Sequence, residues 1–194
     1  MTPESTRSLK ERIGRAEQGL LEAKKELTGL RRRLPPEEFS DYDFKTWDGG
    51  QVRLSELFGG KQDLIVVHNM GRTCPYCTMW ADGFNGVLDH IQNRVAFVVV
   101  SPDGPQTQRE FAQGRGWRFR MVSGEGSTFT RDAGYETPEG APWPGVSAFR
   151  RTGDGKIHRT AHTSFGPGDD FCSVWHLFDL LEGGPRGWAP KFGY

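Results

Sequence analysis

The first 34 residues carry one regular hydrophobic pattern. Apolar residues recur at alternating spacings of four and three positions: Leu9, Ile13, Ala16, Leu20, Ala23, Leu27, Leu30 and Leu34. This is the a/d pattern of a heptad repeat, and it predicts a long helix from about Thr6 to Leu34. Pro35-Pro36 ends it, because proline cannot continue a helix. Two interpretations stay open, a helix laid along its own domain and an arm that forms a homodimer.

After residue 36 the pattern changes to alternating strands and helices. The chain therefore divides into a helical extension, 1–36, and a second domain, 37–194. The predicted strands are 42–44, 51–53, 63–68, 95–100, 118–122, 145–150 and 157–163. The predicted helices are 54–58, 75–92, 105–115 and 169–181, the last capped by Asp169 or Asp170. The central β-α-β-α-β run predicts a right-handed parallel core, and hence an α/β fold.

Composition narrows the class of protein. The formal net charge of the 194 residues is zero, which gives no argument for nucleic acid or an anionic membrane as a partner. No stretch approaches the roughly 18 apolar residues of a membrane span, and the N-terminus lacks the apolar centre of a signal peptide. We expect a cytoplasmic protein, in which a disulfide is transient and catalytic rather than structural.

Two of the three cysteines form a Cys74-Pro75-Tyr76-Cys77 motif directly after the predicted strand 63–68. A thiol that follows a strand and opens a helix has its thiolate stabilised by the helix N-terminus. The second thiol, one turn later, can attack a mixed disulfide that the first one forms. The motif therefore predicts a redox dithiol, with Cys74 as the nucleophile, Cys77 as the resolving thiol and Arg72 as a nearby cation. No cofactor beyond a Cys74–Cys77 disulfide is expected.

Several segments carry a resemblance to a known family. They are Lys25-Glu26-Leu27-Thr28, His68-Asn69-Met70, the run from Cys74 to Gly86, Gly116-Trp117-Arg118-Phe119 and Trp143-Pro144-Gly145-Val146-Ser147. Through these, residues 9–194 resemble a bacterial family of unknown function described as predicted dithiol–disulfide oxidoreductases. The resemblance implies a thioredoxin-like fold, with a central mixed sheet flanked by helices and a long N-terminal helix. It says little about the substrate, since fold does not determine function.

The resemblance also implies the surroundings of the dithiol. Thioredoxin-like folds carry a cis-proline facing the two cysteines, and Pro144 has that place, with the Trp143 backbone offered to substrate. The segment 164–168, including Gly166, Pro167 and Gly168, is expected to line the same groove. Asp169-Asp170 is similar to the glutaredoxin loop that holds glutathione, although helix capping explains both aspartates as well.

Other side chains near the motif have open roles. His68 ends the strand before the dithiol and can either assist proton transfer at Cys74 or fill the core. Tyr76, with Pro75, matches the dipeptide between the cysteines of glutaredoxins. The expected partners are a disulfide-bearing protein or a small thiol such as glutathione.

Three alternatives compete with this interpretation. Cys172 and His176 are spaced i, i+4 and with Cys74 and Cys77 would make a Cys3His zinc set. A peroxiredoxin-type peroxidase is a closer rival, although the threonine three residues before its reacting cysteine is missing here. The third is a binding module with incidental thiols. We expect no metal.

Overall fold

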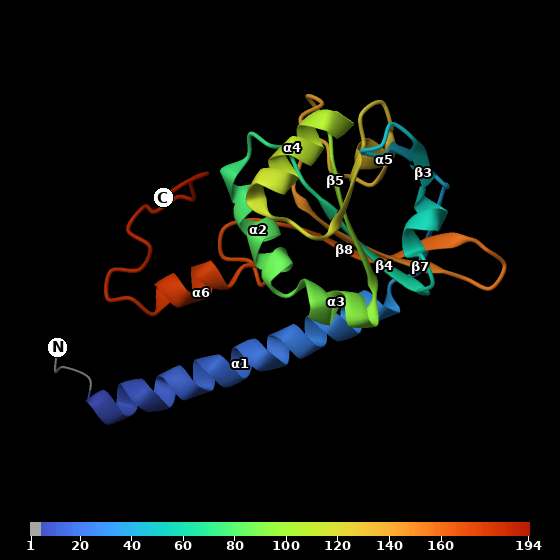
Figure 1. The fold of residues 1–194 in the computed structure, drawn as a ribbon. Helices are drawn as coiled ribbons and strands as arrows, with labels where there is room; N and C mark the ends of the chain where they lie inside the picture. The colour runs from blue at the N-terminus through green and yellow to red at the C-terminus, as the bar shows by residue number, and fades with distance from the viewer. Residues whose placement is uncertain (1–4) are drawn as a thin grey trace. The chain divides into compact units, whose positions relative to one another are not determined.

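The structure, a computed structural model, describes residues 5–194 (Figure 1). The chain divides into two compact units, Met1–Pro36 and Glu37–Tyr194. The first unit is the helix α1, Thr6–Arg33. The Ser5 side chain accepts a hydrogen bond from the Ser8 N–H and caps its start. Leu34 leaves the helix in an extended conformation, as expected of a residue before proline.

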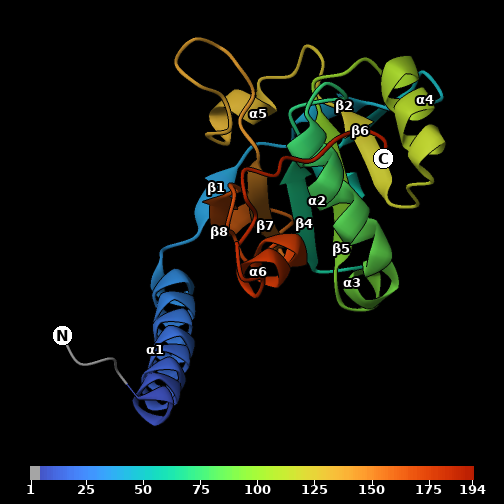
Figure 2. The ribbon, with the colours of Figure 1, turned by 90° about the vertical axis from the view of Figure 1, so that its left-hand side faces the viewer.

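The second unit is built on one eight-stranded mixed sheet, which confirms the predicted α/β class. Its strands are β1 Glu37–Phe39, β2 Asp43–Lys45, β3 Gln51–Arg53, β4 Asp63–His68, β5 Ala96–Ser101, β6 Arg120–Ser123, β7 Gly145–Arg151 and β8 Ile157–Ser164. They lie in the order β1-β8-β7-β4-β5-β6-β2-β3. In Figure 2 the strands from β1 to β5 follow one another in this order, with α2 in front of the sheet. The pairs β4–β5 and β5–β6 are parallel, as predicted, whereas β7 joins β4 antiparallel.

Helices cover both faces of this sheet. They are η1 Leu54–Phe58, α2 Pro75–Gly86, α3 Leu88–Arg94, α4 Pro105–Arg115, α5 Phe129–Asp132 and α6 Ser173–Asp179. Successive strand residues point to opposite faces, so Val66 and Val67 belong to two different apolar clusters. The first cluster, with Val66, holds η1 and α5 against the sheet, and the second, with Val67, holds α2, α3, α4 and α6.

Four details differ from the sequence-based expectations. The helix predicted over 75–92 is two helices separated at Val87, whose φ and ψ of −113° and 13° are not helical. At the break the Val87 side chain is 48% exposed, while Leu88 is buried. The last helix begins at Ser173, with Cys172 at the cap position, because Asp169 and Asp170 belong to the preceding loop. Strand β1 and the short helix α5 were not predicted.

Among residues 5–194, no helix is long and apolar enough to cross a membrane.

Candidate active site

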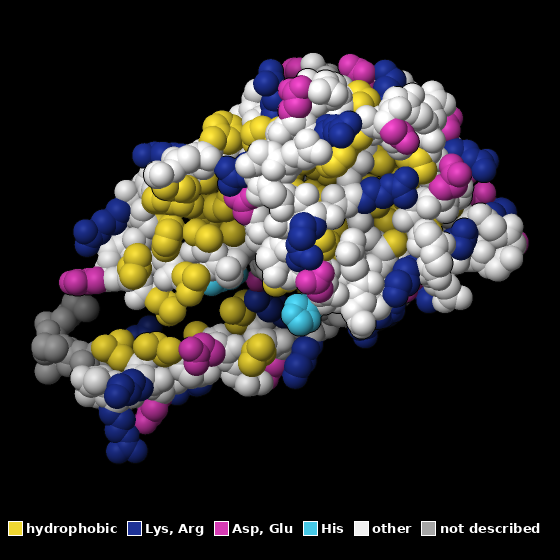
Figure 3. Space-filling view, viewed as in Figure 1, with side chains coloured by type: hydrophobic (Ala, Val, Ile, Leu, Met, Phe, Trp, Pro, Cys, Tyr) yellow, Lys and Arg dark blue, Asp and Glu magenta, His cyan; other side chains and the backbone are white. Residues whose placement is uncertain are grey.

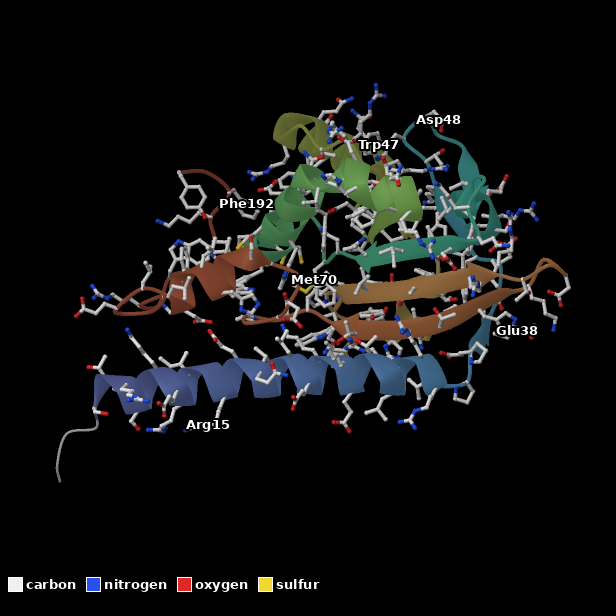
Figure 4. All side chains as sticks on the ribbon, turned by 90° about the horizontal axis from the view of Figure 1, so that it is seen from below. Arg15, Glu38, Trp47, Asp48, Met70 and Phe192 are labelled. Atoms are coloured by element: carbon white, nitrogen blue, oxygen red, sulfur yellow. The ribbon has the colours of Figure 1, made fainter. Side chains whose placement is uncertain are left out.

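Three chain segments meet at one end of the sheet. His68, the last residue of β4, pairs with Gly145 at the start of β7, which in turn pairs with Ser164 at the end of β8. The loop 69–74 with the dithiol, the residues Trp143-Pro144 and the segment 165–168 therefore leave the sheet at the same end. In Figure 4, Met70 in this loop and Glu38 near the β7–β8 hairpin lie at opposite ends of the strands.

The loop between β4 and α2 is held by side chains that sequence analysis missed. Gly71 adopts a φ of 101°, and its N–H donates to Asn69 Oδ1 at 2.8 Å. The carboxylate of Asp103 accepts from the Arg72 N–H at 2.9 Å. A Cβ atom on Gly71 would stand 3.0 Å from that carboxylate, so glycine is required for both backbone angle and space. Nothing in the sequence position of Asp103, two residues before the predicted helix 105–115, indicates this contact.

Cys74 is the N-cap residue of α2, and Pro75 occupies the first helical position. The CxxC spacing puts Cys77 at the third position of the helix, where its N–H donates to Cys74 Sγ at 3.0 Å. A sulfur at this place receives the stabilisation that a helix N-terminus offers to negative charge. All three cysteines are free thiols in this structure, and Cys74 is slightly more exposed than Cys77, at 7% against 3%.

The two thiols differ strongly in acidity. A hydrogen bond from the Cys77 side chain, together with the backbone N–H groups of Cys77 and Tyr76, lowers the pKa of Cys74 to about 7, against the opposing effect of burial. The same contact with Cys74, burial and the charge on Cys74 raise the pKa of Cys77 far above the ordinary range. Near neutral pH a large fraction of Cys74 is therefore thiolate while Cys77 stays a thiol, the arrangement that a nucleophile and a resolving cysteine require.

Arg72 does not contribute to this shift. The groups that lower the pKa of Cys74 are the Cys77 thiol and two backbone N–H groups, and Arg72 is not among them. Its side chain is exposed, and its backbone N–H is the part bound by Asp103. The Cys77 thiol and the N–H groups at the start of α2 lower the pKa of Cys74, without the cation that the sequence suggested.

His68 is a core residue and not a neighbour of the dithiol. Its ring stacks on Tyr135 at 3.7 Å and on Phe129 at 5.4 Å, in the cluster on the face opposite to α2. Its Nε2 atom bonds Ser147 Oγ at 3.0 Å, while Nδ1 is buried without a hydrogen-bond partner among the described residues. Strand alternation causes this placement, because β4 sends Val67 toward α2 and His68 the other way. Of the two roles left open by the sequence, the structure therefore favours the core histidine.

Pro144 lies at the expected end of the sheet but is not a cis-proline, since residues 5–194 contain no cis peptide bond. The Trp143 N–H donates to the Tyr135 carbonyl at 2.7 Å and the Phe165 N–H to the Pro144 carbonyl at 2.9 Å. The second bond continues the β7–β8 ladder beyond the Gly145–Ser164 pair, and the first ties Trp143 to the segment after α5. The Trp143 side chain is 48% exposed, and Pro144 is buried.

The segment after β8 is tied to α2 by Asp169. Its carboxylate accepts hydrogen bonds from the Gly166 and Phe171 N–H groups and from the Trp80 indole. The Phe165 ring packs on Trp80 at 5.2 Å, and Tyr76 stacks on Trp175 of α6 at 6.1 Å. Asp169 therefore braces the loop and does not cap a helix, while Pro167 and Gly168 remain exposed beside it.

The zinc alternative is not supported. Among the described residues 5–194, no group of three or more His, Cys, Asp or Glu side chains is arranged to hold a metal ion. His176 lies 3.7 Å from Asp170, and Cys172 is buried in the apolar cluster with Trp175. Burial raises the pKa of the Cys172 thiol, so it is a poor nucleophile.

The sheet order, the helices on both faces and a CxxC motif opening α2 define a thioredoxin-like protein. The chain belongs to the bacterial family of unknown function DUF899, which matches residues 5–190. No curated protein matches it.

Solved structures of peroxiredoxins share the fold. Peroxidoxin BcpB from Mycobacterium tuberculosis is 20% identical, with a TM-score of 0.54 over 66% of this chain and 84% of its own. Reduced Prx3 from Vibrio vulnificus, in complex with hydrogen peroxide, is 13% identical, with a TM-score of 0.57 over 70% and 90%. A cysteine mutant of peroxiredoxin Q from Xanthomonas campestris is 17% identical, with a TM-score of 0.53 over 63% and 79%. At these identities the likeness establishes the fold.

Proposed function

We propose that this protein is a thiol–disulfide oxidoreductase with Cys74 as the nucleophile and Cys77 as the resolving thiol. One observation carries the proposal: Cys74 Sγ caps α2 and accepts the Cys77 N–H, so that its pKa falls to about 7 while that of Cys77 rises. A low-pKa thiol one helical turn from a protonated thiol is the chemistry of disulfide exchange.

The reaction balances as a two-electron exchange. The Cys74 thiolate attacks one sulfur of a substrate disulfide, a mixed disulfide forms, and the other substrate sulfur leaves as a thiolate that takes up a proton. Cys77 then loses its proton and attacks Cys74 Sγ, which releases the second substrate thiol and leaves a Cys74–Cys77 disulfide. The substrate is reduced and the enzyme oxidised, and a thiol or dithiol donor must return the enzyme to its dithiol state.

The substrate disulfide would approach between the loop 69–74 and the segments Trp143-Pro144 and Gly166-Pro167-Gly168, because all three leave the sheet at one end. A disulfide-bearing protein and a small disulfide such as that of glutathione are both candidates. A glutathione-type contact through Asp169 would compete with the hydrogen bonds that both of its carboxylate oxygens accept from the chain itself.

Two cysteine variants test the proposal. Cys74→Ser should abolish reduction of insulin or of a small disulfide, because it removes the nucleophile. Cys77→Ser should retain attack and accumulate a mixed disulfide, visible as added mass after alkylation. Cys172→Ser is the matched control and should keep wild-type activity. Disulfide reduction that persists in Cys74→Ser would contradict the proposal.

A thiol peroxidase is the second candidate, and the peroxiredoxin folds of the solved structures favour it. In that reaction the Cys74 thiolate attacks the peroxide, takes one oxygen as sulfenic acid and releases an alcohol or water. Cys77 condenses with the sulfenic acid to a disulfide and water. The position three residues before Cys74 is Gly71, which offers no hydroxyl to activate the peroxide. To compare the two activities, the rates of peroxide consumption and of insulin reduction should be measured on the same sample with the same dithiol donor. The faster reaction identifies the favoured function.

A further inference from the structure

Helix α1 carries a row of apolar side chains with no buried residue among them. The large apolar residues of this row, Leu9, Ile13, Leu20, Leu27 and Leu30, are between 44% and 57% exposed, and Leu34, which follows the last helical residue, is 59% exposed. Figure 3 shows apolar side chains in a row along this helix. This helix of 28 residues should gain stability when the row is covered, because most helical stability in proteins comes from packing of an apolar face.

The heptad positions follow from the spacing of the row. Ile13, Leu20, Leu27 and Leu34 occupy a positions, and Leu9, Ala16, Ala23 and Leu30 occupy d positions. Gly14, Gly19 and Gly29 all fall outside this seam. The residues that flank the seam are Arg12, Gly19, Glu26 and Arg33 at g, and Lys10, Glu17, Lys24 and Arg31 at e.

These flanking charges are complementary to those of a second, identical helix that lies parallel to the first. In a parallel pair, each g residue faces the e residue of the next heptad on the partner. Arg12 then faces the partner's Glu17, and Glu26 faces the partner's Arg31, so both fully charged pairings are attractive. The remaining pairings, Ser5 with Lys10 and Gly19 with Lys24, contain one uncharged residue each. Two-fold symmetry makes each attractive pair occur twice.

In an antiparallel pair, in the register that places a residues opposite d residues, the charge pairing is less favourable. There e faces e and g faces g, so Lys10 meets Arg31 and Arg12 meets Arg33, both repulsive. Only Glu17 with Lys24 remains attractive. Charge complementarity therefore favours a second α1 helix as the partner of this face, in the parallel orientation.

We propose that α1 binds α1 of a second copy of this chain as a parallel two-stranded coiled coil, with ion pairs from Arg12 to the partner's Glu17 and from Glu26 to the partner's Arg31. The dimer would carry two dithiol sites, one on each Glu37–Tyr194 unit. The proposal is independent of the dithiol chemistry.

The first experiment measures the mass of the full chain by sedimentation equilibrium. The wild type should have twice the 21.8 kDa of one chain. Glu17→Arg should raise the dimer dissociation constant about tenfold, because both copies of the Arg12–Glu17 pair become repulsive. The double variant Arg12→Glu, Glu17→Arg should restore the wild-type constant. Lys25→Glu, at an f position away from the seam, is the control and should change nothing.

The second experiment determines the direction of the helices. In a background with all three native cysteines changed to serine, Leu9→Cys should form a disulfide-linked dimer on mild oxidation, because a parallel pair brings the two d positions together. An antiparallel pair places residue 9 opposite residue 34 instead, and Lys25→Cys, which points away from the seam, should not cross-link.

A monomeric wild type, or a dimer that Glu17→Arg leaves unchanged, would overturn the coiled coil. A dimer in which Leu9→Cys fails to cross-link would overturn the parallel direction. Insulin reduction should also be measured on Glu17→Arg. This variant keeps the dithiol site whether or not the chain dimerises, so the assay tests the proposed function separately from the coiled coil.

Discussion

At the scale of single residues, the chemistry of the site depends on how one backbone N–H is placed. Cys77 acts on Cys74 twice, through its thiol and through its N–H, and both contacts stabilise the Cys74 thiolate. The CxxC motif after a strand predicted stabilisation by the helix N-terminus, to which the Cys77 N–H belongs, but not the hydrogen bond from the Cys77 thiol. The contribution of Arg72 was predicted wrongly, since proximity in sequence does not tell where a long side chain points.

The acidity of Cys74 leads to a prediction about its reactivity with pH. The thiolate is the nucleophile, so the alkylation rate of Cys74 by iodoacetamide should be half-maximal near pH 7. Below that pH the rate should fall about tenfold per unit, and above pH 8 it should be flat. Mass spectrometry of quenched samples resolves Cys74 from the other two cysteines. Cys77→Ala removes the donor thiol and should move the midpoint upward, and an unchanged midpoint would contradict the assignment.

His68 makes stability depend on pH. Burial, together with the charges of Arg159 and His162, holds the pKa of His68 well below its ordinary value of 6.5. The unfolded chain therefore binds a proton below pH 6.5 that the folded chain does not, and stability is lost as the pH falls. Where His68 is protonated in the unfolded chain and neutral in the folded one, the slope approaches about 1.4 kcal/mol per pH unit.

The variant His68→Gln should abolish this part of the pH dependence in urea unfolding, whatever it does to stability at pH 7. The exposed His90 provides the control, and His90→Gln should keep the wild-type slope. Equal slopes for wild type and His68→Gln would show that His68 titrates normally.

At the scale of elements, the limits of β4 and α4 were predicted to the residue, because a dense apolar run and a Gly-Pro start identify them without tertiary information. The break between α2 and α3 was not predicted. It follows from the packing of Leu88 into the sheet, and a helical periodicity does not reveal it. Strand β1 was not predicted either, because Glu37-Glu38-Phe39 forms a strand by pairing with β8, which is distant in sequence.

The junction of β4, β7 and β8 provides a test at this scale. A Cβ atom on Gly145 would lie 2.1 Å from the Tyr135 ring and 2.6 Å from the Thr163 carbonyl oxygen. Gly145→Ala should therefore lower the free energy of unfolding by at least about 1–3 kcal/mol. Gly153→Ala, in the β7–β8 turn where nothing lies within 4 Å, should be nearly neutral. Denaturant unfolding that ranks the two variants equally would contradict the crowding at Gly145.

At the scale of the whole molecule, the two units should unfold differently. All six tryptophans lie after Pro36, so their fluorescence reports on Glu37–Tyr194 alone. If α1 forms the proposed coiled coil, part of the helical circular dichroism should melt at a temperature that rises with protein concentration. The tryptophan transition should not depend on concentration. A single transition seen equally by both probes at every concentration would show that the units unfold together.

The sequence by itself determined the parts of this protein that depend on local order along the chain. These are the long helix and its heptad pattern, the alternating strands and helices, and a dithiol at a strand–helix junction, since periodicity and capping act between residues close in sequence. Only the tertiary structure decided which face of the sheet receives His68, how Asp103 and Asp169 brace the loops around the dithiol, and that the Trp143–Pro144 bond is trans. Those features come from contacts between residues far apart in the chain, for which no local pattern exists.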